Sequence, residues 1–348
     1  MRRMGNGWAA MAAAAGLALL AGCATVSAGP RQVDVVVQRQ ETIAKAARVA
    51  DWQLNRLTTF DYVRTFQPQT ADPRNWIQAT LYAGLADFAD ATGDVRYVEA
   101  IERHGAAENW GFQDRPRHAD ADAIGHAWIW SARRHEGEER ARRLAPILAR
   151  FEAVLASPSH VDLLFSERPG EAPCQVRWCW SDAVFMAPPV WTALSQATGD
   201  PRYAAHAKRE LDATVATLFD RDEALFYRDS RFFDRRDAAG RKVFWSRGNG
   251  WALAGLAKMI QTLPEDDPDR RRYEALFQTM SDRVVGLQGE AGYWPVSLLD
   301  PSGPPETSGT AFFVFSLAWG LNAGLLEGER FEVAAERGWS ALDRAVQP

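Results

Sequence analysis

Cysteine and histidine are scarce in this chain of 348 residues, which has three cysteines and six histidines. A zinc site takes about four ligands, mostly cysteine and histidine, at characteristic spacings. The two cysteines outside the N-terminal segment, Cys174 and Cys179, have no histidines at such spacings, and we expect neither a metal nor an organic cofactor. In an oxidising compartment this pair is expected either to form a disulfide ahead of Asp182 or to remain two thiols.

A marked charge excess is also absent. The net charge of -5 argues against a nucleic-acid partner, which a basic surface would bind. Strand-like alternation is rare after residue 31, and the hydrophobic fraction of 47% provides an ample core. Helical periodicity recurs instead, and it predicts an all-α chain with helices at 37–57, 76–91, 95–105, 120–135, 138–156, 182–197, 202–218, 249–263, 270–287, 308–324 and 330–346.

The most apolar run lies at the N-terminus, where residues 9–21 follow two arginines. This run is too short to span a bilayer well and predicts a signal peptide. It ends in Leu-Ala-Gly-Cys, which resembles a bacterial lipobox, so we expect residues 1–22 to be removed and Cys23 to be lipidated. Because Ala24 rather than Asp follows, the predicted location is the periplasmic side of the outer membrane. Cleavage after Ala28, which gives a soluble periplasmic protein, is the alternative.

Residues 23–36 are then a tether, and residues 37–348 form the predicted catalytic domain. Within that domain a short motif occurs twice, as Ala-Thr-Gly-Asp-Val-Arg-Tyr at 91–97 and Ala-Thr-Gly-Asp-Pro-Arg-Tyr at 197–203. Glycine suits the left-handed residue after a helix, and aspartate caps the next helix. The motif therefore predicts a joint between two helices, with the Arg and Tyr packed across the turn.

Apolar and charged helices alternate along the chain. The apolar set begins near Trp76, Asp120, Asp182, Asn249 and Ser308. The helices between them carry charge and are expected to face solvent. This alternation predicts an inner ring of helices wrapped by an outer ring, with the inner N-termini gathered at one end.

Asp182 is the centre of the most distinctive helix start. It follows Trp178 and Trp180, whose flat faces suit stacking on a sugar. Two interpretations stay open: Asp182 is an acid or base in catalysis, or it is only an N-cap, a position for which Ser181 competes.

Arg247 lies in a second such stretch, Phe-Trp-Ser-Arg-Gly-Asn-Gly-Trp at 244–251. Its guanidinium suits a carboxylate in a bidentate way, although a structural ion pair is the alternative. Gly248 and Gly250 are expected to let the backbone approach a ligand closely.

Three blocks carry a family resemblance: Trp-x-Asp-x-x-Phe-Met-x-x-Pro around Asp182, the block at 244–251, and Glu-Thr-Ser-Gly-Thr-Ala at 306–311. They resemble glycoside hydrolase family 105, the unsaturated rhamnogalacturonyl hydrolases, which is related to the unsaturated glucuronyl hydrolases of family 88. The likeness runs from about Trp76 to Trp339. It implies an (α/α)6 barrel, which agrees with the predicted ring.

The resemblance also implies a reaction, removal of a 4,5-unsaturated uronic acid from the non-reducing end of lyase-generated oligosaccharides. Asp182 would protonate C4 of the vinyl ether, and water activated by the resulting carboxylate would add at C5. The hemiketal then opens and expels the leaving sugar. Such an acid works best with a pKa near the working pH, and the adjacent tryptophans are expected to raise the pKa by desolvation.

Further site residues follow from the same resemblance. Asp120 matches the second family aspartate, which holds sugar hydroxyls, and Asp122 is the competing candidate. Trp245 and Arg247 match positions that stack on the sugar ring and hold the uronate. Three more aromatic residues are expected to line the site: Trp178, Trp180 and Trp251.

Two positions depart from the family pattern. Arg228 stands where many relatives carry a histidine that holds substrate, which suggests a more anionic or differently linked substrate. His126 stands where relatives often carry glutamine, and it is either a site residue or a packed histidine. The eleven predicted helices are one fewer than a barrel of this kind has, so helices 37–57 and 330–346 would have to seal the gap.

Two other classes of function stay open. One is a different helical-barrel carbohydrate enzyme, such as a lyase or an epimerase. The other is a non-catalytic sugar-binding surface lipoprotein, which would keep the tryptophans but need no acid. The expected partner in every case is an oligosaccharide, the only membrane association is the lipid anchor, and no oligomeric state follows from the sequence.

Overall fold

The structure, a computed structural model, describes residues 30–59, 71–166 and 173–347. Cys23 and the predicted signal peptide lie outside the described residues. The chain divides into two units, residues 1–48 and residues 49–348. Helix α1 spans Pro30–Leu54, so it begins inside the stretch predicted as a tether. Across the described ranges, every helix is either too short or too polar to cross a membrane.

The other helices follow the predicted periodicity. They are α2 (Trp76–Thr92), α3 (Val95–Ala107), α4 (Ala119–Asp122), α5 (Gly125–Ala132), α6 (Gly137–Ala156), α7 (Ala183–Met186), α8 (Pro188–Thr198), α9 (Pro201–Leu218), α10 (Ser246–Thr262), α11 (Arg270–Val285), α12 (Thr307–Asn322) and α13 (Glu329–Ala345). Two short antiparallel ribbons add β1 (Phe219–Asp220) paired with β2 (Leu225–Phe226), and β3 (Trp294–Pro295) paired with β4 (Pro305–Glu306).

Two helices that were predicted as continuous are broken. The helix expected at 182–197 is divided into α7 and α8, with Ala187 between them. Pro188 and Pro189 explain this break, because proline has no backbone N–H to donate to the preceding turn. The helix expected at 120–135 is likewise divided into α4 and α5.

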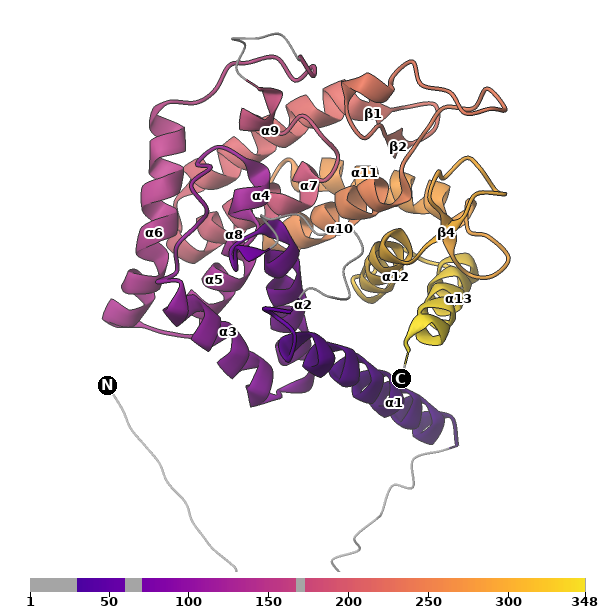
Figure 1. Cartoon of the computed structure of the whole chain (residues 1–348), viewed down its shortest axis with the longest axis horizontal. Helices are drawn as coiled ribbons and strands as arrows, with labels where there is room; N and C mark the ends of the chain where they lie inside the picture. The colour runs from indigo at the N-terminus through magenta and orange to yellow at the C-terminus, as the bar shows by residue number, and fades with distance from the viewer. Residues whose placement is uncertain (1–29, 60–70, 167–172, 348) are drawn as a thin grey trace, which may run out of the picture. The chain divides into compact units, whose positions relative to one another are not determined.

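Inner and outer helices alternate as predicted, in a helical barrel. The inner helices contact one another in chain order, α2 with α5, α5 with α8, α8 with α10, and α10 with α12. Figure 1 shows α3, α6, α9 and α13 at the periphery. The inner helix α10 is buried along most of its length. That helices 37–57 and 330–346 seal the barrel stays a prediction.

The repeated joints have the predicted construction. Gly199 ends α8 with a φ of 76°, and the Asp200 side chain caps α9. Tyr203 then donates its hydroxyl to Glu152 of the outer helix α6, with 2.6 Å between the oxygens. The joint at 91–97 is built in the same way. In each copy the motif forms the turn between two consecutive helices, and its tyrosine bonds to the helix that precedes them.

Glycine at two positions lets α10 approach α7 closely. A Cβ on Gly248 would lie 2.6 Å from Ser181 Oγ, and a Cβ on Gly255 would overlap the carbonyl group of Val184. The second of these neighbours is backbone, which cannot rotate away as a side chain can. The start of α7, and with it Asp182, is therefore held directly against α10 between Gly248 and Gly255.

We expect Gly255→Ala to lower the free energy of unfolding by about 1–3 kcal/mol, because the added methyl group must push α10 away from the backbone of α7. The matched change is Gly84→Ala, at an exposed α2 position where a Cβ would meet nothing within 4 Å. It should preserve or raise stability, because alanine favours the helix. Urea unfolding of both variants measures the difference, and equal stabilities would contradict this packing.

Candidate active site

Asp182 stands directly before α7 but does not cap it. Its side chain makes no capping hydrogen bond, and its Oδ2 instead accepts a hydrogen bond of 3.0 Å from Ser181 Oγ. Burial raises the pKa of Asp182, while the Ser181 bond and the charges of Arg228 and Arg247 act in the opposite direction. Asp182 therefore occupies the N-cap position, but its half-buried carboxyl group does not serve as the cap.

Asp120 of α4 is the second carboxyl group of the site. Burial and then the negative charge of Asp182 raise its pKa to about 7. Its Oδ2 lies 3.7 Å from Nδ1 of His118. That contact is not an ion pair, because burial lowers the pKa of His118 to about 3 and Nδ1 accepts the backbone N–H of Asp120. The negative charge of Asp182 thus acts on the second carboxyl group predicted from the sequence.

Asp122, the competing candidate, is a structural residue. Its side chain is buried and accepts hydrogen bonds from Nε of Arg150 at 2.8 Å and from Nε1 of Trp191 at 3.2 Å. A carboxylate enclosed by these partners stabilises the packing of α4 against the outer helix α6. Of the two, Asp120 therefore stays the candidate site residue.

The backbone of Arg228 is anchored beside Asp182. The side chain of Asn249 in α10 accepts from the N–H of Phe226 at 2.7 Å and donates to its carbonyl oxygen at 3.0 Å, which fixes strand β2. Two residues further on, the carbonyl oxygen of Arg228 accepts the N–H of Ser181 at 2.9 Å. The Arg228 side chain, which is 43% exposed, is consequently set where its charge acts on Asp182.

Arg247 lies over Trp245, with its guanidinium carbon 4.2 Å from the ring centre. Glu306, at the start of α12, accepts from Nη1 at 2.7 Å and from the Arg247 backbone N–H at 2.9 Å. The structural ion pair is therefore present. The side chain nevertheless remains 36% exposed, and its Nε and Nη2 make no hydrogen bond to the residues that the structure describes. One edge of the guanidinium is left for an anion.

The predicted tryptophans divide into two groups. Trp180 is half-buried, and its ring centre lies 4.9 Å from that of His118. Trp178 is buried against His206, and Trp251 is buried against aromatic rings of three inner helix segments. Neither of these two buried rings offers a face to a sugar, contrary to the prediction, because both fill the core behind the site.

His126 is a packed histidine. Its Nε2 lies 3.1 Å from the carbonyl oxygen of Phe185, and burial lowers its pKa to about 3. The expectation that Gly248 and Gly250 admit a ligand is also corrected. A Cβ at Gly250 would lie 2.8 Å from Cβ of Phe312, so both glycines make room for neighbouring protein.

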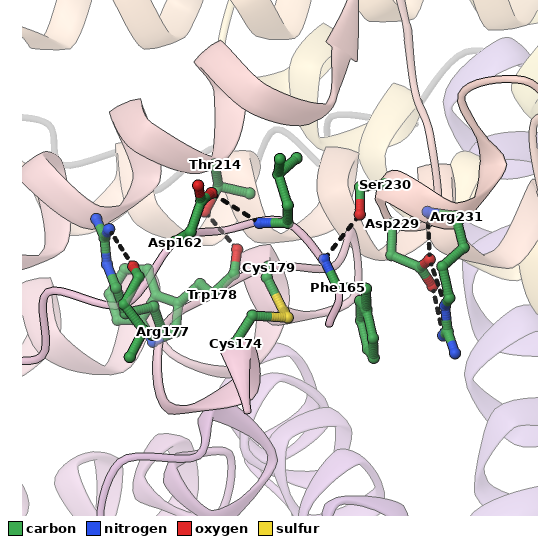
Figure 2. The surroundings of a disulfide bond; sticks show 12 residues. Asp162, Phe165, Cys174, Arg177, Trp178, Cys179, Thr214, Asp229, Ser230 and Arg231 are labelled. Carbon is green, nitrogen blue, oxygen red and sulfur yellow. Dashed lines mark hydrogen bonds and ion pairs between the residues drawn. A yellow bond between two sulfur atoms is a disulfide. The ribbon is translucent and has the colours of Figure 1, made fainter. Parts of the chain in front are cut away.

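A disulfide joins Cys174 and Cys179 in the loop that leads to the site, so the disulfide alternative holds. Figure 2 shows its surroundings, where Thr214 of α9 donates its hydroxyl to the carbonyl oxygen of Trp178 at 2.6 Å. The loop is thus closed on itself and fastened to an outer helix. The disulfide and the Thr214 hydrogen bond together restrict the conformations of the segment that ends at Asp182.

Three supporting residues have functions that the sequence did not predict. Ser181 bonds to Asp182, Glu306 holds Arg247, and His118 bonds to the backbone of Asp120. Glu306 could not have been paired with Arg247 from spacing, because the two come from different helices. Across the described ranges, no three His, Cys, Asp or Glu side chains lie close enough together to hold a metal ion.

Comparison with known proteins is consistent with this geometry. The family model named Glycosyl Hydrolase Family 88 matches residues 45–348. An unsaturated 3S-rhamnoglycuronyl hydrolase of Alteromonas sp. (strain LOR) is 37% identical in an alignment of 329 residues, and the match covers 90% of this chain and 79% of that protein. A protein of the same name from Formosa agariphila is 34% identical, over 78% of this chain and 73% of its own length.

Two solved structures share the fold. A glycosyl hydrolase family 88 protein from Bacteroides vulgatus has a TM-score of 0.69 and 26% identity, and the match covers 84% of this chain and 84% of that one. A protein named as a polysaccharide lyase has a TM-score of 0.71 and 26% identity, with 87% of this chain and 85% of that one covered.

We expect Asp182→Asn to lower the pKa of Asp120 from about 7, because the variant removes a negative charge that disfavours ionisation of the second carboxyl group. Carboxyl carbon NMR of aspartate-labelled protein measures the titration midpoint. Asp266→Asn, a change in an exposed turn, should leave the midpoint in place. An Asp120 midpoint that is the same in all three proteins would contradict the proximity of the two carboxyl groups.

Proposed function

Because the chain belongs to glycosyl hydrolase family 88, we propose that it removes a 4,5-unsaturated uronic acid from the non-reducing end of oligosaccharides produced by polysaccharide lyases. One observation carries the proposal. Asp182 is a half-buried carboxyl group with a raised pKa, no cap to serve, and a second carboxyl group nearby whose pKa is about 7. A purely sugar-binding site would have no need of such a pair.

In the proposed reaction Asp182 first acts as an acid. Its raised pKa favours the protonated form, and the proton is transferred to C4 of the enol ether, which leaves an oxocarbenium-like centre at C5. The Asp182 carboxylate then accepts a proton from the water that adds at C5. The resulting hemiketal opens, the bond to the leaving sugar breaks, and Ser181 holds the carboxyl group in one orientation throughout.

The substrate carboxylate is assigned to the two arginines of the site. Arg247 offers the edge of its guanidinium that Glu306 does not use, and Arg228 adds charge from the side of β2. Trp245 supports Arg247, and we assign stacking on the sugar to its ring. Asp120, with a pKa of about 7, can donate or accept a hydrogen bond at neutral pH, which suits vicinal hydroxyl groups.

For the leaving sugar we propose rhamnose. Two relatives that share more than a third of their aligned residues with this chain are named as unsaturated 3S-rhamnoglycuronyl hydrolases. Arg228, where many relatives have a histidine, adds a positive charge that suits a more anionic substrate. Both points favour a rhamnoglycuronyl substrate over a fragment of pectin.

A lyase is the second candidate, because one of the structural neighbours is named as one. A lyase must remove the proton at C5 with a base. Near Asp182 each histidine uses one ring nitrogen, since His126 Nε2 contacts a carbonyl oxygen and His118 Nδ1 accepts a backbone N–H, so the structure alone leaves the lyase as an alternative. The two reactions change the ultraviolet absorbance in opposite directions, because the hydrolase removes the conjugated double bond and a lyase creates one.

We expect Asp182→Asn to slow the loss of ultraviolet absorbance from an unsaturated rhamnoglycuronyl disaccharide by about a thousandfold, within the range for loss of a general acid. The matched variant Asp266→Asn, in an exposed turn, should act like the wild type. Full activity of Asp182→Asn would overturn the assignment of the acid, and a gain of absorbance on intact polysaccharide would point to the lyase.

We also propose that Cys23 carries a lipid, since the residues before it resemble a lipobox. In a bacterial host, full-length wild type should be found in the membrane fraction, and Cys23→Ala in the soluble fraction. The test is immunoblotting of both fractions. A membrane-bound Cys23→Ala protein would contradict lipidation at this residue.

A further inference from the structure

We propose that Arg150, on the outer helix α6, is a positioning residue that holds Asp120 in the orientation that the reaction requires. The inference rests on the proposed function and adds to it a residue that lies outside the site. In the described part of the chain the hydrogen bonds of Arg150 go to residues other than Asp120 and Asp182. Its effect is therefore carried by the short helix α4 and by the loop that precedes this helix.

Helix α4 is too short to fix its own orientation. It has four residues, Ala119–Asp122, and a single helical turn is not stable in water by itself. At its start the His118 side chain caps it by accepting the backbone N–H of Asp120. The direction in which the Asp120 side chain points consequently depends on what holds the other end of α4.

Asp122 connects that end of α4 to Arg150. Two residues along a helix are rotated by about 200°, so the side chains of Asp120 and Asp122 point in nearly opposite directions. Asp122 is buried, with its Oδ1 2.8 Å from Nε of Arg150 and its Oδ2 3.2 Å from Nε1 of Trp191. Any rotation of α4 that moved Asp122 away from these donors would turn Asp120 away from Asp182 by the same angle.

The same guanidinium also holds the loop before α4. Its Nη1 donates to the carbonyl oxygen of Gln113 at 3.2 Å, and its Nη2 donates to that of Arg115 at 2.6 Å. The Arg150 side chain is 8% exposed, and its three nitrogens serve three acceptors on two segments of the chain. A planar guanidinium presents its donors in a fixed fork, whereas lysine has one nitrogen on a flexible stem. Lysine would therefore keep the charge but not the arrangement.

Arg143 provides a matched comparison on the same helix. Its side chain is 7% exposed, it pairs with Glu102 of α3, and it donates to Ser131 of α5. Neither α3 nor α5 carries a residue assigned to the reaction. Loss of either arginine leaves a buried acid without its partner, which lowers the free energy of unfolding. Of the two arginines only Arg150 is bonded to α4.

The kinetic test compares Arg150→Lys with Arg143→Lys on an unsaturated disaccharide, at a temperature at which both variants are folded. We expect Arg150→Lys to lower kcat/KM by about a hundredfold, because a small displacement of a group that holds the substrate is costly even when the substitution is distant. Arg143→Lys should keep the kcat/KM of wild type. A fall of equal size in both variants, or in neither, would overturn the inference.

The titration of Asp120 tests its position without relying on activity. Burial and then the charge of Asp182 raise its pKa to about 7, Arg115 acts against them, and Asp122 raises the pKa further. A carboxyl group that turns away from the site loses the two largest contributions, burial and the charge of Asp182. Its pKa then falls toward the ordinary value for aspartate, about 3.9.

Carboxyl carbon NMR of aspartate-labelled protein measures this pKa. The Asp120 midpoint should fall in Arg150→Lys and stay at about 7 in Arg143→Lys. Because lysine keeps the positive charge at position 150, removal of that charge cannot explain the fall. An unchanged midpoint in Arg150→Lys would contradict the assignment.

Trp191→Phe is the second variant, and it decides the question if Arg150→Lys does not fold. It removes the other donor to Asp122 and keeps an aromatic ring against Phe151. The Asp120 midpoint should fall in this variant as well, because Asp122 is held less firmly. A midpoint that stays at the wild-type value would count against the positioning of α4 through Asp122.

The two measurements separate this inference from the proposed function. If wild type hydrolyses no unsaturated disaccharide but the midpoint falls in Arg150→Lys and not in Arg143→Lys, only the proposed function fails. If hydrolysis occurs and the midpoint is the same in all three proteins, only the positioning assignment fails.

Discussion

The first turn of α10 holds the site together, because three consecutive residues each contact a different segment of the chain. Arg247 binds Glu306 at the start of α12, Gly248 leaves the space that Ser181 fills, and Asn249 fixes the strand that leads to Arg228. Three segments that are separate in sequence therefore meet within one helical turn. Asp182 is positioned by the same turn, since Ser181 bonds both to it and to the carbonyl oxygen of Arg228.

The same turn also controls the electrostatics. Two unpaired arginines beside Asp182 would favour its ionised form and take away the proton that the reaction needs. Asp229 and Glu306 each pair with one of these arginines and offset part of that charge. The effect of burial then outweighs the effect of the remaining positive charge, and the pKa of Asp182 is raised. The ion pairs thus reconcile two demands, an anion-binding site and a protonated acid within it.

Local chemistry explains which parts of the fold could be predicted. The joint at Gly199 and Asp200 was predictable because its left-handed residue and its cap need only neighbours in sequence. The break between α7 and α8 was not predicted, although its cause, Pro188 and Pro189, is equally local. The order of inner and outer helices followed from periodicity. Asp182 and Arg247 followed from motifs that keep their spacing.

Burial of particular rings could not be predicted in this way. Trp178, Trp180 and Trp251 have the same chemistry, yet only Trp180 keeps an exposed part, because the other two meet side chains from distant helices. The choice between Asp120 and Asp122 had the same difficulty. Two residues apart on a short helix, they point to different surroundings, and only the position of Arg150 on α6 distinguishes them.

The barrel also separates the reacting residues from the loops around them. The acid and the arginines that serve it sit at helix starts or against them, where a change would disturb the packing of the whole ring. A cavity of about 450 Å³ is instead lined by the loop before α4 and by the disulfide loop before α7. Loops of this kind can change with little effect on the core. The reacting residues can therefore be kept while these loops change, and the disulfide gives one of the loops the rigidity that the helices give the rest.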